Sequence, residues 1–355
     1  MIPTHAPPET IAMLTRDRLI ELLAKARGLR IGVAGDFCLD RYGTAEMSGQ
    51  SRETGGRIVR IKDHFFSPGG AANISWNVAE LGAHCAALAL LGGDAFGVTL
   101  RDVLRHKHVD TESIVFDPAR QTASFEKIRV SDGTATTEVR WDVVNRRPVS
   151  AEAEARFAKA IESAAEQLDC LIVADYDEAG SGVLTPGVVE CLNRIARTGH
   201  VRVLGTSRLR IGAFTPVIAV VNEYEAAQTA GMKDIGVFDT VPRARLDTAG
   251  ADLARRNGRA AFVTRGKDGM AVYSPDGKRV DAPTVAATSE VDICGAGDTA
   301  LAAIAAALCA GARPAEAAML GNIAARVSIH KIGVTGAASP EEILLSYEHF
   351  ERSGR

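Results

Sequence analysis

The 355-residue chain lacks three motifs that would place it in common enzyme classes. It has no GxxxxGK[ST] loop, which excludes a P-loop NTPase. No GxGxxG follows the first apolar run, which argues against a dinucleotide site, and there is no GxSxG nucleophile elbow. A basic surplus is also missing, because 41 Lys and Arg stand against 44 Asp and Glu. Nucleic-acid-binding proteins carry such a surplus or a basic stripe, so we expect no nucleic-acid partner.

Cysteine is sparse and unpaired. The six cysteines form no CxxC pair, and the eight histidines do not join them at metal-ligand spacing. We therefore expect reduced, mostly buried thiols and no structural zinc. The N-terminus lacks the basic-then-apolar order of a signal peptide, and the longest run of small apolar residues, 300–310, is too short to span a bilayer. These absences predict a cytoplasmic protein with no membrane partner.

What the sequence does contain is a regular alternation of apolar runs and helical stretches. An amphipathic helix is expected over residues 9–27, ahead of the first buried strand. Repeated strand-helix alternation predicts an α/β fold with a mostly parallel sheet. The apolar runs that we interpret as strands are 29–36, 84–92, 168–175, 200–205, 216–221 and 259–266.

Two β-rich segments, 41–68 and 122–142, interrupt this alternation. The second contains two strand-like runs around "SDG", which is a hairpin signal. We expect the two segments to lie together as a small second sheet that projects from the main body.

The stretch "VDICGAGDTA" (291–300) carries the most specific chemical signal. Glycines let backbone N–H groups converge, and at a helix N-terminus those groups are unpaired and suit a phosphate. Asp298, in the first turn of the Ala-rich helix that follows, would then lie beside the anion. A carboxylate suits that place if it accepts a proton from an attacking hydroxyl. The alternative is an ordinary Asp at a Gly-rich helix start, and this motif alone gives the two interpretations even odds.

Further polar residues follow other expected strands, where ligands bind in open α/β sheets. Asp36 and Asp40 follow the first strand, and "SPGGAAN" (67–73) opens a helix with Gly69, Gly70 and Asn73. Such acceptors and donors suit sugar hydroxyls, although each motif alone is as easily a capped turn.

Two later motifs suit a nucleotide. In "NEYE", Asn222 and Glu225 share a face of one helical turn and could orient Mg²⁺ through water. "TRGKDG" (264–269) is typical of a turn that contacts nucleotide phosphates.

Taken in this order, the motifs resemble the ribokinase-like (PfkB) carbohydrate kinase family over residues 28–345. Within that family the chain is most similar to the heptose-7-phosphate kinases, through "GDFCLDRY", "PGGAANISWNVAELGA", "VTRGKDGM" and "NIAARVSIHKIGVTGAASPEEI". The resemblance implies a three-layer α/β/α fold with a β-sheet lid, and an ATP-dependent sugar kinase. It places the kinase domain at 29–345, between an N-terminal extension (1–28) and the end of a C-terminal helix (346–355).

The resemblance also implies a role for each matching residue. Asp298 would be the base, with the amides of Gly295, Ala296 and Gly297 stabilising the transferred phosphoryl group. A monovalent cation, K⁺, would bind near Asp292, and the lid would form a homodimer interface. Asn222 and Glu225 would place Mg²⁺. The sugar would contact Asp36, Asp40, Gly69, Gly70 and Asn73, and ATP would contact Asn222, Thr264, Gly266, Gly269 and Asn322. To the sugar site we add Lys127 and Arg129, which are candidates from their charge and not from the family pattern.

The substrate side departs from the heptose kinases. The family's "DPK" is replaced by "GTSR" (205–208), and the Lys expected after "DY" is replaced within "DYDEAG". The lid segment "SRETGGR" (51–57) stands where the family has "SPEAPVP". A substrate phosphate needs Arg or Lys partners, for which Arg41, Arg52, Lys127, Arg129 and Arg208 are candidates. A kinase for another phosphorylated sugar or a nucleoside, or a non-catalytic sugar- or nucleotide-binding regulator, therefore remain alternatives.

Overall fold

Buried apolar strands form the centre of the molecule, which a computed structural model describes over residues 14–236, 239–284, 287 and 289–353. Eight strands pair in the order β14-β13-β12-β11-β10-β9-β1-β4. The strands from β4 to β12 are parallel, and β13 and β14 add an antiparallel edge. Their bounds are β1 Arg30–Gly35, β4 His84–Leu88, β9 Cys170–Asp175, β10 Arg202–Ser207, β11 Ile218–Asn222, β12 Ala261–Thr264, β13 Met270–Tyr273 and β14 Arg279–Ala282.

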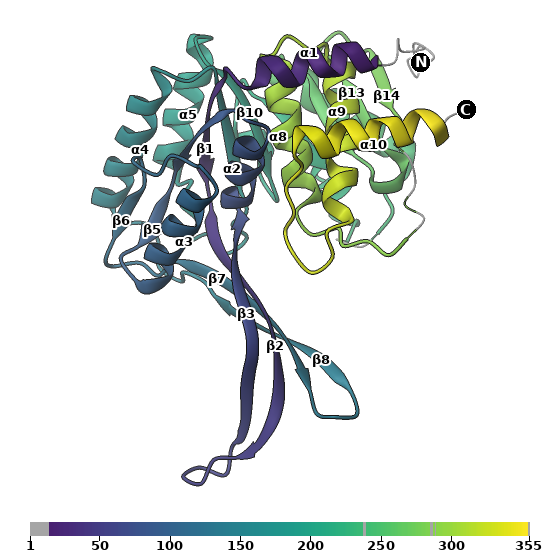
Figure 1. The fold of residues 1–355 in the computed structure, drawn as a ribbon. Helices are drawn as coiled ribbons and strands as arrows, with labels where there is room; N and C mark the ends of the chain where they lie inside the picture. Colours follow the sequence, from purple (N-terminus) through teal and green to yellow (C-terminus); the bar gives the residue numbers. More distant parts are fainter. Residues whose placement is uncertain (1–13, 237–238, 285–286, 288, 354–355) are drawn as a thin grey trace.

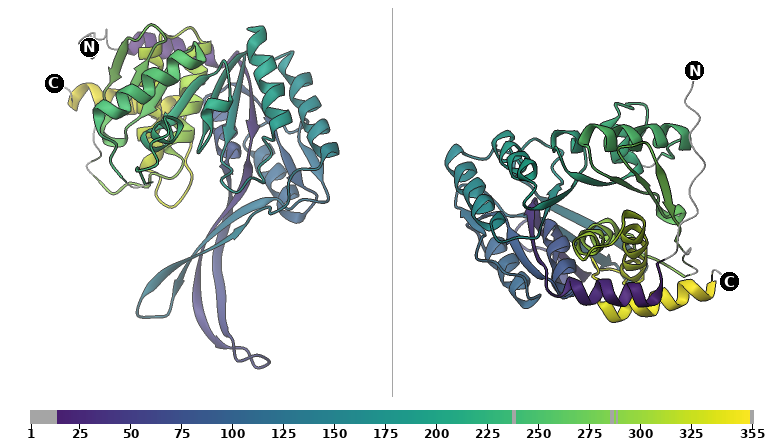
Figure 2. Two further views of the ribbon diagram at one scale, coloured as in Figure 1. Left: turned by 180° about the vertical axis from the view of Figure 1, so that it is seen from behind. Right: turned by 90° about the horizontal axis from the view of Figure 1, so that it is seen from above.

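Helices cover both faces of this sheet because both faces are apolar. Side chains alternate along a strand, so Ile172 belongs to one buried cluster and the neighbouring Val173 to the other. The cluster of Ile172 is shared with α1 Arg16–Ala26, α2 Ala71–Glu80, α3 Ala95–His106, α8 Ala296–Cys309, α9 Pro314–Ile329 and α10 Pro340–Ser353. The cluster of Val173 is shared with α4 Ala151–Ala165, α5 Pro186–Thr198, α6 Glu223–Thr229 and α7 Arg243–Asn257 (Figures 1 and 2).

A separate four-stranded sheet projects from the body as a long arm (Figure 1). Its strands pair in the order β3-β2-β7-β8, with β2 and β7 parallel and the outer pairs antiparallel. A small cluster of Ala45, Ile128 and Val130 is the apolar centre of the arm. The strands are β2 Phe37–Gln50, β3 Arg57–Gly70, β7 Ala123–Ser131 and β8 Thr136–Val143, and a short parallel pair, β5 Leu90–Gly92 and β6 Val115–Asp117, lies beside the main sheet. We call the four-stranded sheet the lid.

Local sequence explains where the helices begin and end. The hydroxyl of Thr185 accepts the amide of Val188 at the start of α5, and Pro186 occupies the first turn, where no amide donor is needed. The same helix ends at Gly199, whose left-handed φ of 69° suits glycine. Such signals set the ends of α5 without any help from the tertiary structure.

The two ends of the described chain lie together. Helices α1 and α10 pack side by side (Figure 1), and the hydroxyl of Tyr347 donates to the carbonyl of Leu14 at 2.7 Å. The expected N-terminal helix is present as Arg16–Ala26, and residues 9–13 of that prediction lie outside the described residues. No helix in the described part of the chain has the length and apolar character that crossing a membrane requires.

The predicted fold class, a three-layer α/β/α body with a mostly parallel sheet and a β-sheet lid, is confirmed. The run at 84–92 forms two strands rather than one, because the chain leaves the main sheet at Ala89 to pair β5 with β6. The domain limits at residues 28 and 345 stay predictions.

Candidate active site

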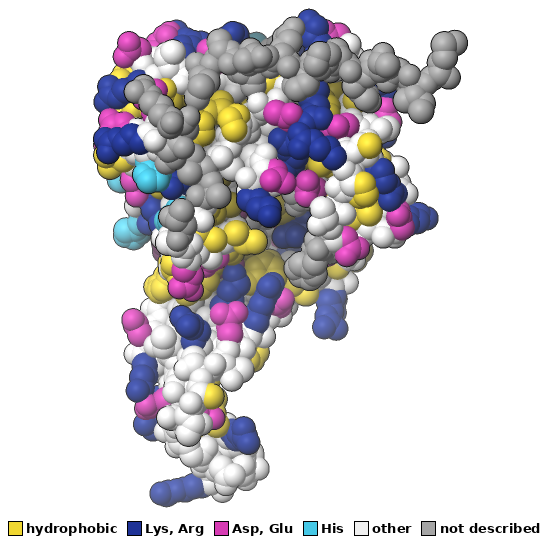
Figure 3. Space-filling view, turned by 90° about the vertical axis from the view of Figure 1, so that its right-hand side faces the viewer, with side chains coloured by type: hydrophobic (Ala, Val, Ile, Leu, Met, Phe, Trp, Pro, Cys, Tyr) yellow, Lys and Arg dark blue, Asp and Glu magenta, His cyan; other side chains and the backbone are white. Residues whose placement is uncertain are grey.

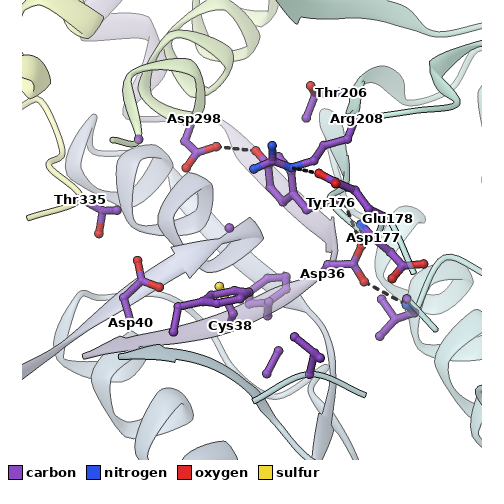
Figure 4. A pocket seen from close by; sticks show the side chains of 18 of the residues that line it. Asp36, Cys38, Asp40, Tyr176, Asp177, Glu178, Thr206, Arg208, Asp298 and Thr335 are labelled. Atoms are coloured by element: carbon purple, nitrogen blue, oxygen red, sulfur yellow. Dashed lines mark hydrogen bonds and ion pairs between the residues drawn. The ribbon is translucent and has the colours of Figure 1, made fainter. Parts of the chain in front are cut away.

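A cavity of ≈ 720 Å³ lies where the lid meets the carboxyl ends of the parallel strands. Its walls come from the ends of β1, β9, β10 and β11, from the base of the lid and from the start of α8. Hydrophobic and basic side chains gather at this junction on the surface (Figure 3). The polar side chains that carry the argument below include Asp36, Asp40, Tyr176, Arg208 and Asp298 (Figure 4). Glu225 lines the same cavity.

Asp298 lies in the first turn of α8 and lines the cavity. Its Oδ2 accepts a hydrogen bond from Asn73 Nδ2 at 2.9 Å, and its Oδ1 accepts one from the hydroxyl of Tyr176 (Figure 4). Burial raises the pKa of Asp298 to about 6, although both hydrogen bonds oppose the rise. A carboxylate with that pKa is ionised at neutral pH and still basic enough to take a proton.

The glycine turn before Asp298 has the geometry that the sequence predicts. Gly295 caps α8 with a φ of 80°, and a Cβ there would lie 2.8 Å from Asn73 Nδ2. Both observations require glycine at that position. The cavity is lined by Gly295 and Gly297, whereas the amide of Ala296 closes a turn with the carbonyl of Ile293 at 3.2 Å. Gly295 and Gly297 are therefore better placed than Ala296 to meet an anion.

Asn73 is fully buried behind Asp298 and does not line the cavity. Its side-chain amide donates to Asp298 and lies against Gly295, so Asn73 supports the carboxylate and the glycine turn. Gly70 opens α2 with a φ of 55° and does line the cavity. Gly69 lies against the buried Asp40, because a Cβ on Gly69 would come within 2.7 Å of Asp40 Oδ1. Gly69 thus leaves room for Asp40 in the cavity wall, and Gly70 leaves room for the ring of Tyr176.

Asp36 lies in the cavity wall, but backbone amides occupy its carboxylate. Oδ2 accepts from the amides of Tyr176 at 3.0 Å and Asp177 at 3.2 Å, and Oδ1 accepts from Val183 at 2.9 Å. Burial raises the pKa of Asp36 to about 6. The structure therefore brings Asp36 and Asp298 to one cavity and also gives Asp36 a second task, that of holding the segment Tyr176–Val183.

The candidate basic residues separate into two groups. Lys127 and Arg208 line the cavity, and Lys127 Nζ lies 3.3 Å from the hydroxyl of Tyr42. Arg129, farther out on β7, is exposed and lies outside the cavity. Arg41 pairs with Glu126 at 2.9 Å, which takes its charge away from the cavity. Arg52, in the turn between β2 and β3, is likewise not part of the cavity.

Asn222 and Glu225 line the cavity as a capping box at the start of α6. Asn222 Oδ1 accepts the amide of Glu225 at 2.8 Å, and Glu225 Oε2 accepts the amide of Asn222 at 2.9 Å. Burial raises the pKa of Glu225 to about 7, and the nearby Asp298 adds to the rise. Glu225 keeps one carboxylate oxygen outside the capping box, and a cation beside it would relieve this cost of burying charge.

The remaining ATP candidates are only partly at the cavity. Thr264 lines it at the end of β12. Gly266 and Gly269 flank a short 3₁₀ turn and are not part of the wall. Asn322 is buried on α9 and donates to the carbonyls of Ala282 at 2.9 Å and Pro283 at 3.1 Å. Asn322 thus fixes the chain that leaves β14, rather than lining the cavity itself.

Asp292 joins two loops next to the glycine turn. Its carboxylate accepts the amides of Cys294 and Gly333, each at 3.0 Å. It does not line the cavity. Among the described residues, no cluster of three or more His, Cys, Asp or Glu side chains could hold a metal. The six cysteines are free thiols, as the sequence predicts.

Sequence reasoning gave no role to several polar residues of the cavity. The position of Tyr176 directly after a buried strand marks it as a residue near the ligand, but nothing in the sequence predicts its contact with Asp298. Arg120 is buried, and its guanidinium donates to the carbonyl of Ser181 at 2.9 Å, whereas its Nη1 has no hydrogen-bond partner among the described residues. Arg140, on β8, also lines the cavity. Nothing in the sequence around these two arginines marks them, because tertiary contacts between distant segments bring them to the cavity.

Comparison with solved structures shows the class of fold. Arabidopsis thaliana ribokinase complexed with ribose and ATP superposes with a TM-score of 0.66 at 17% identity, covering 90% of this chain and 98% of the ribokinase. Escherichia coli phosphofructokinase-2 in complex with potassium superposes with a TM-score of 0.69 at 16% identity, covering 91% of this chain and all of the other. The architecture is therefore that of the ribokinase-like sugar kinases.

The sequence comparison then gives the family. The chain matches the pfkB family of carbohydrate kinases over residues 32–342, and it belongs to that family. A curated relative, the bifunctional protein HldE of Pelobacter propionicus, is 32% identical over 335 residues, which are 93% of this chain and 66% of HldE. This chain thus spans just under two thirds of that relative's length. The predicted family resemblance is confirmed.

Proposed function

We propose that this chain is an ATP-dependent sugar kinase that transfers the γ-phosphoryl group to a hydroxyl of a sugar or sugar phosphate, with heptose 7-phosphate as the first candidate acceptor. The observation that carries the proposal is the position of Asp298. Its carboxylate lines the cavity beside the Gly295 turn and has a pKa of about 6. A protein that only binds sugar or nucleotide needs no base at that place.

The chemistry follows from this arrangement. The acceptor hydroxyl binds beside Asp298 and gives up its proton to the carboxylate as its oxygen attacks the γ-phosphorus. The bond between the γ-phosphorus and the β–γ bridging oxygen breaks, and ADP leaves with that oxygen and its negative charge. Negative charge on the transferred group meets the amides at the start of α8, where the helix dipole is positive. Asp298 therefore removes a proton and the turn stabilises charge, while the lid limits access of water.

ATP and Mg²⁺ complete the reaction in this proposal. The nucleotide would bind on the side of the cavity that Thr264 and Asn222 line. Gly266 and Gly269 belong to the turn after β12, and Asn322 holds the end of β14 beside it. The free oxygen of Glu225 fits Mg²⁺ through a water molecule, whereas Asn222 already uses its oxygen as a cap. When bound, Mg²⁺ would neutralise charge on the phosphates. A K⁺ site near Asp292 remains part of the proposal as well.

The basic side chains of the cavity favour an acceptor sugar that carries a negative charge. Lys127, Arg120 and Arg140 all line the cavity, and the buried Arg120 has an unpartnered Nη1. Arg and Lys are the usual partners of a phosphate, so these three side chains replace the basic residues that the heptose kinase pattern leads us to expect. Asp40 and Gly70 supply the sugar side of the same wall.

A coupled assay of ADP formation tests the proposal. The panel contains heptose 7-phosphate, fructose 6-phosphate, ribose and adenosine, with Asp298→Asn enzyme as the blank for contaminating kinases. We expect acceptor-dependent ADP release, highest with a sugar phosphate. If ATP binds by calorimetry but no acceptor raises ADP formation above the blank, the chain is a binding protein and the kinase proposal fails.

We also propose that the lid mediates a homodimer. Its outer strands carry exposed hydrophobic side chains, among them Ile58, Val59, Ile61, Phe65 and Trp141. Exposed apolar side chains gathered on one element favour a protein partner. Light scattering of the wild type and of Trp141→Lys would show the dimer and its loss, and a monomeric wild type would contradict it.

A further inference from the structure

The hydroxyl of Tyr176 is one of two donors that hold the carboxylate of Asp298. Asn73 binds Oδ2 from α2, and Tyr176 binds Oδ1 from the segment after β9. In Figure 4 the tyrosine ring points from that segment directly toward Asp298. No other role in the proposed reaction uses Tyr176.

The ring of Tyr176 is fixed on both sides. A Cβ on Gly70 would lie 3.2 Å from Tyr176 Cδ2, so the absence of a side chain lets the ring approach the start of α2. The guanidinium carbon of Arg208 lies 5.6 Å from the ring centroid, and Arg208 also pairs with Glu178 at 3.4 Å. A cation over an aromatic face favours this packing. Tyr176 is therefore held in one orientation by its neighbours.

The backbone that carries Tyr176 is fixed by Asp36. The amides of Tyr176, Asp177 and Val183 all donate to its carboxylate, at 3.0, 3.2 and 2.9 Å. Two of the three contacts are at the start of the segment and the third is at its end. Asp36 thus closes the segment Tyr176–Val183 into a loop whose first side chain reaches Asp298.

We propose that Tyr176 is a positioning residue, whose hydroxyl keeps Asp298 oriented and ionised for proton transfer, and that Asp36 anchors the loop that carries it. This inference rests on the proposed kinase function. It gives Asp36 a role that does not require contact with the sugar, and it connects two carboxylates on different strands through one tyrosine.

Several titratable groups besides Tyr176 lie near Asp298 and affect its pKa. Arg208, after β10, favours its ionised form, whereas Asp40 of the lid opposes it. Glu225 of α6 also faces Asp298, and so does the thiol of Cys38 on β2. Removing only the hydroxyl of Tyr176 leaves these four in place. The carboxylate then loses one donor, and its pKa must rise.

The test is the pH dependence of kcat/KM in Tyr176→Phe. Loss of a hydrogen bond to a carboxylate raises the pKa of that group by about one unit or more. We therefore expect the acidic limb to move upward by about one unit, so that kcat/KM below the limb falls roughly tenfold while the value at high pH changes little. Asp36→Asn should move the limb in the same direction, because its amide group can accept fewer of the three loop amides.

Tyr273→Phe is the matched control. Tyr273 is also buried, and its hydroxyl donates to the carboxylate of Asp247 at 2.7 Å, away from the cavity. It should lose comparable stability and keep the wild-type pH profile. The inference would be overturned if kcat/KM of Tyr176→Phe fell by the same factor at every pH, with the acidic limb at the wild-type pH. An equal shift of the limb in Tyr273→Phe would also overturn it.

A second measurement separates this inference from the kinase proposal. Carboxyl-¹³C NMR of labelled aspartate, assigned with Asp298→Asn, follows the titration of Asp298 without turnover. If no acceptor is phosphorylated, the kinase proposal fails, yet a higher Asp298 pKa in Tyr176→Phe still supports the contact. An unchanged titration refutes the positioning role whatever the assay shows.

Discussion

The side-chain amide of Asn73 donates to Oδ2 of Asp298 at 2.9 Å, although the two residues are 225 positions apart in the chain. Asn73 lies in the first turn of α2 and Asp298 in the first turn of α8. The contact fixes the starts of two helices against each other. It helps to explain the glycine at position 295, since a Cβ there would lie 2.8 Å from Asn73 Nδ2.

Replacing Asp298 with Asn tests the base. The variant keeps the size of the side chain and removes its proton affinity, so we expect kcat to fall by at least about a hundredfold. ATP affinity should stay the same or improve, because a negative charge beside the phosphates is gone. Turnover and ATP binding by calorimetry measure both effects.

Asp247→Asn is the control for that variant, because Asp247 also accepts a tyrosine hydroxyl but lies outside the cavity. Its turnover should remain near that of the wild type. Near-normal turnover of Asp298→Asn would show that Asp298 only begins a helix.

Gly295→Ala should destabilise the protein. The residue has a φ of 80°, and the new Cβ would lie 2.8 Å from Asn73 Nδ2. A non-glycine residue in that conformation costs on the order of 1–3 kcal/mol. Thermal unfolding measures the loss of stability. Gly297→Ala is the matched stability control, because no atom of a described residue lies within 4 Å of its Cβ position. Equal melting temperatures for the two variants would contradict the assigned turn geometry.

Glu225→Gln should flatten the pH dependence of stability. Burial raises the pKa of Glu225 from 4.5 to about 7 in the folded state. Because the folded pKa is the higher one, this carboxyl favours folding at low pH, and that stability is lost as pH rises from about 4.5 through 7. Between pH 5 and pH 8 the wild type should therefore lose roughly 2 kcal/mol more than the variant.

Urea unfolding at the two pH values, in the presence of a metal chelator, makes this comparison. Asp36 and Asp298 also have raised pKa values. The contribution of Asp36 cancels in the difference, whereas Asp298 interacts with Glu225, so its titration is followed by carboxyl-¹³C NMR in both proteins and subtracted. Glu152→Gln, at the exposed start of α4, controls for loss of a charge. Parallel pH profiles for wild type and Glu225→Gln would refute the burial of this charge.

The sequence alone was enough to predict the class of fold and the glycine turn of the candidate site. Alternating apolar runs required a parallel sheet covered by helices, and the glycines before Asp298 required a turn with converging amides, because both depend on local geometry. The order of the motifs was also enough to give the family.

Tertiary structure decided which of these residues act together. Asn73 supports Asp298 through a hydrogen bond, Arg129 lies too far out on β7 to line the cavity, and Asn322 holds the end of β14. Arg140 reaches the cavity through the pairing of the lid strands, Arg120 reaches it from the loop between β6 and β7, and Tyr176 reaches Asp298 through a loop closed by Asp36. Periodicity along a chain fixes which face of an element is buried, whereas contacts between distant segments depend on how whole elements pack.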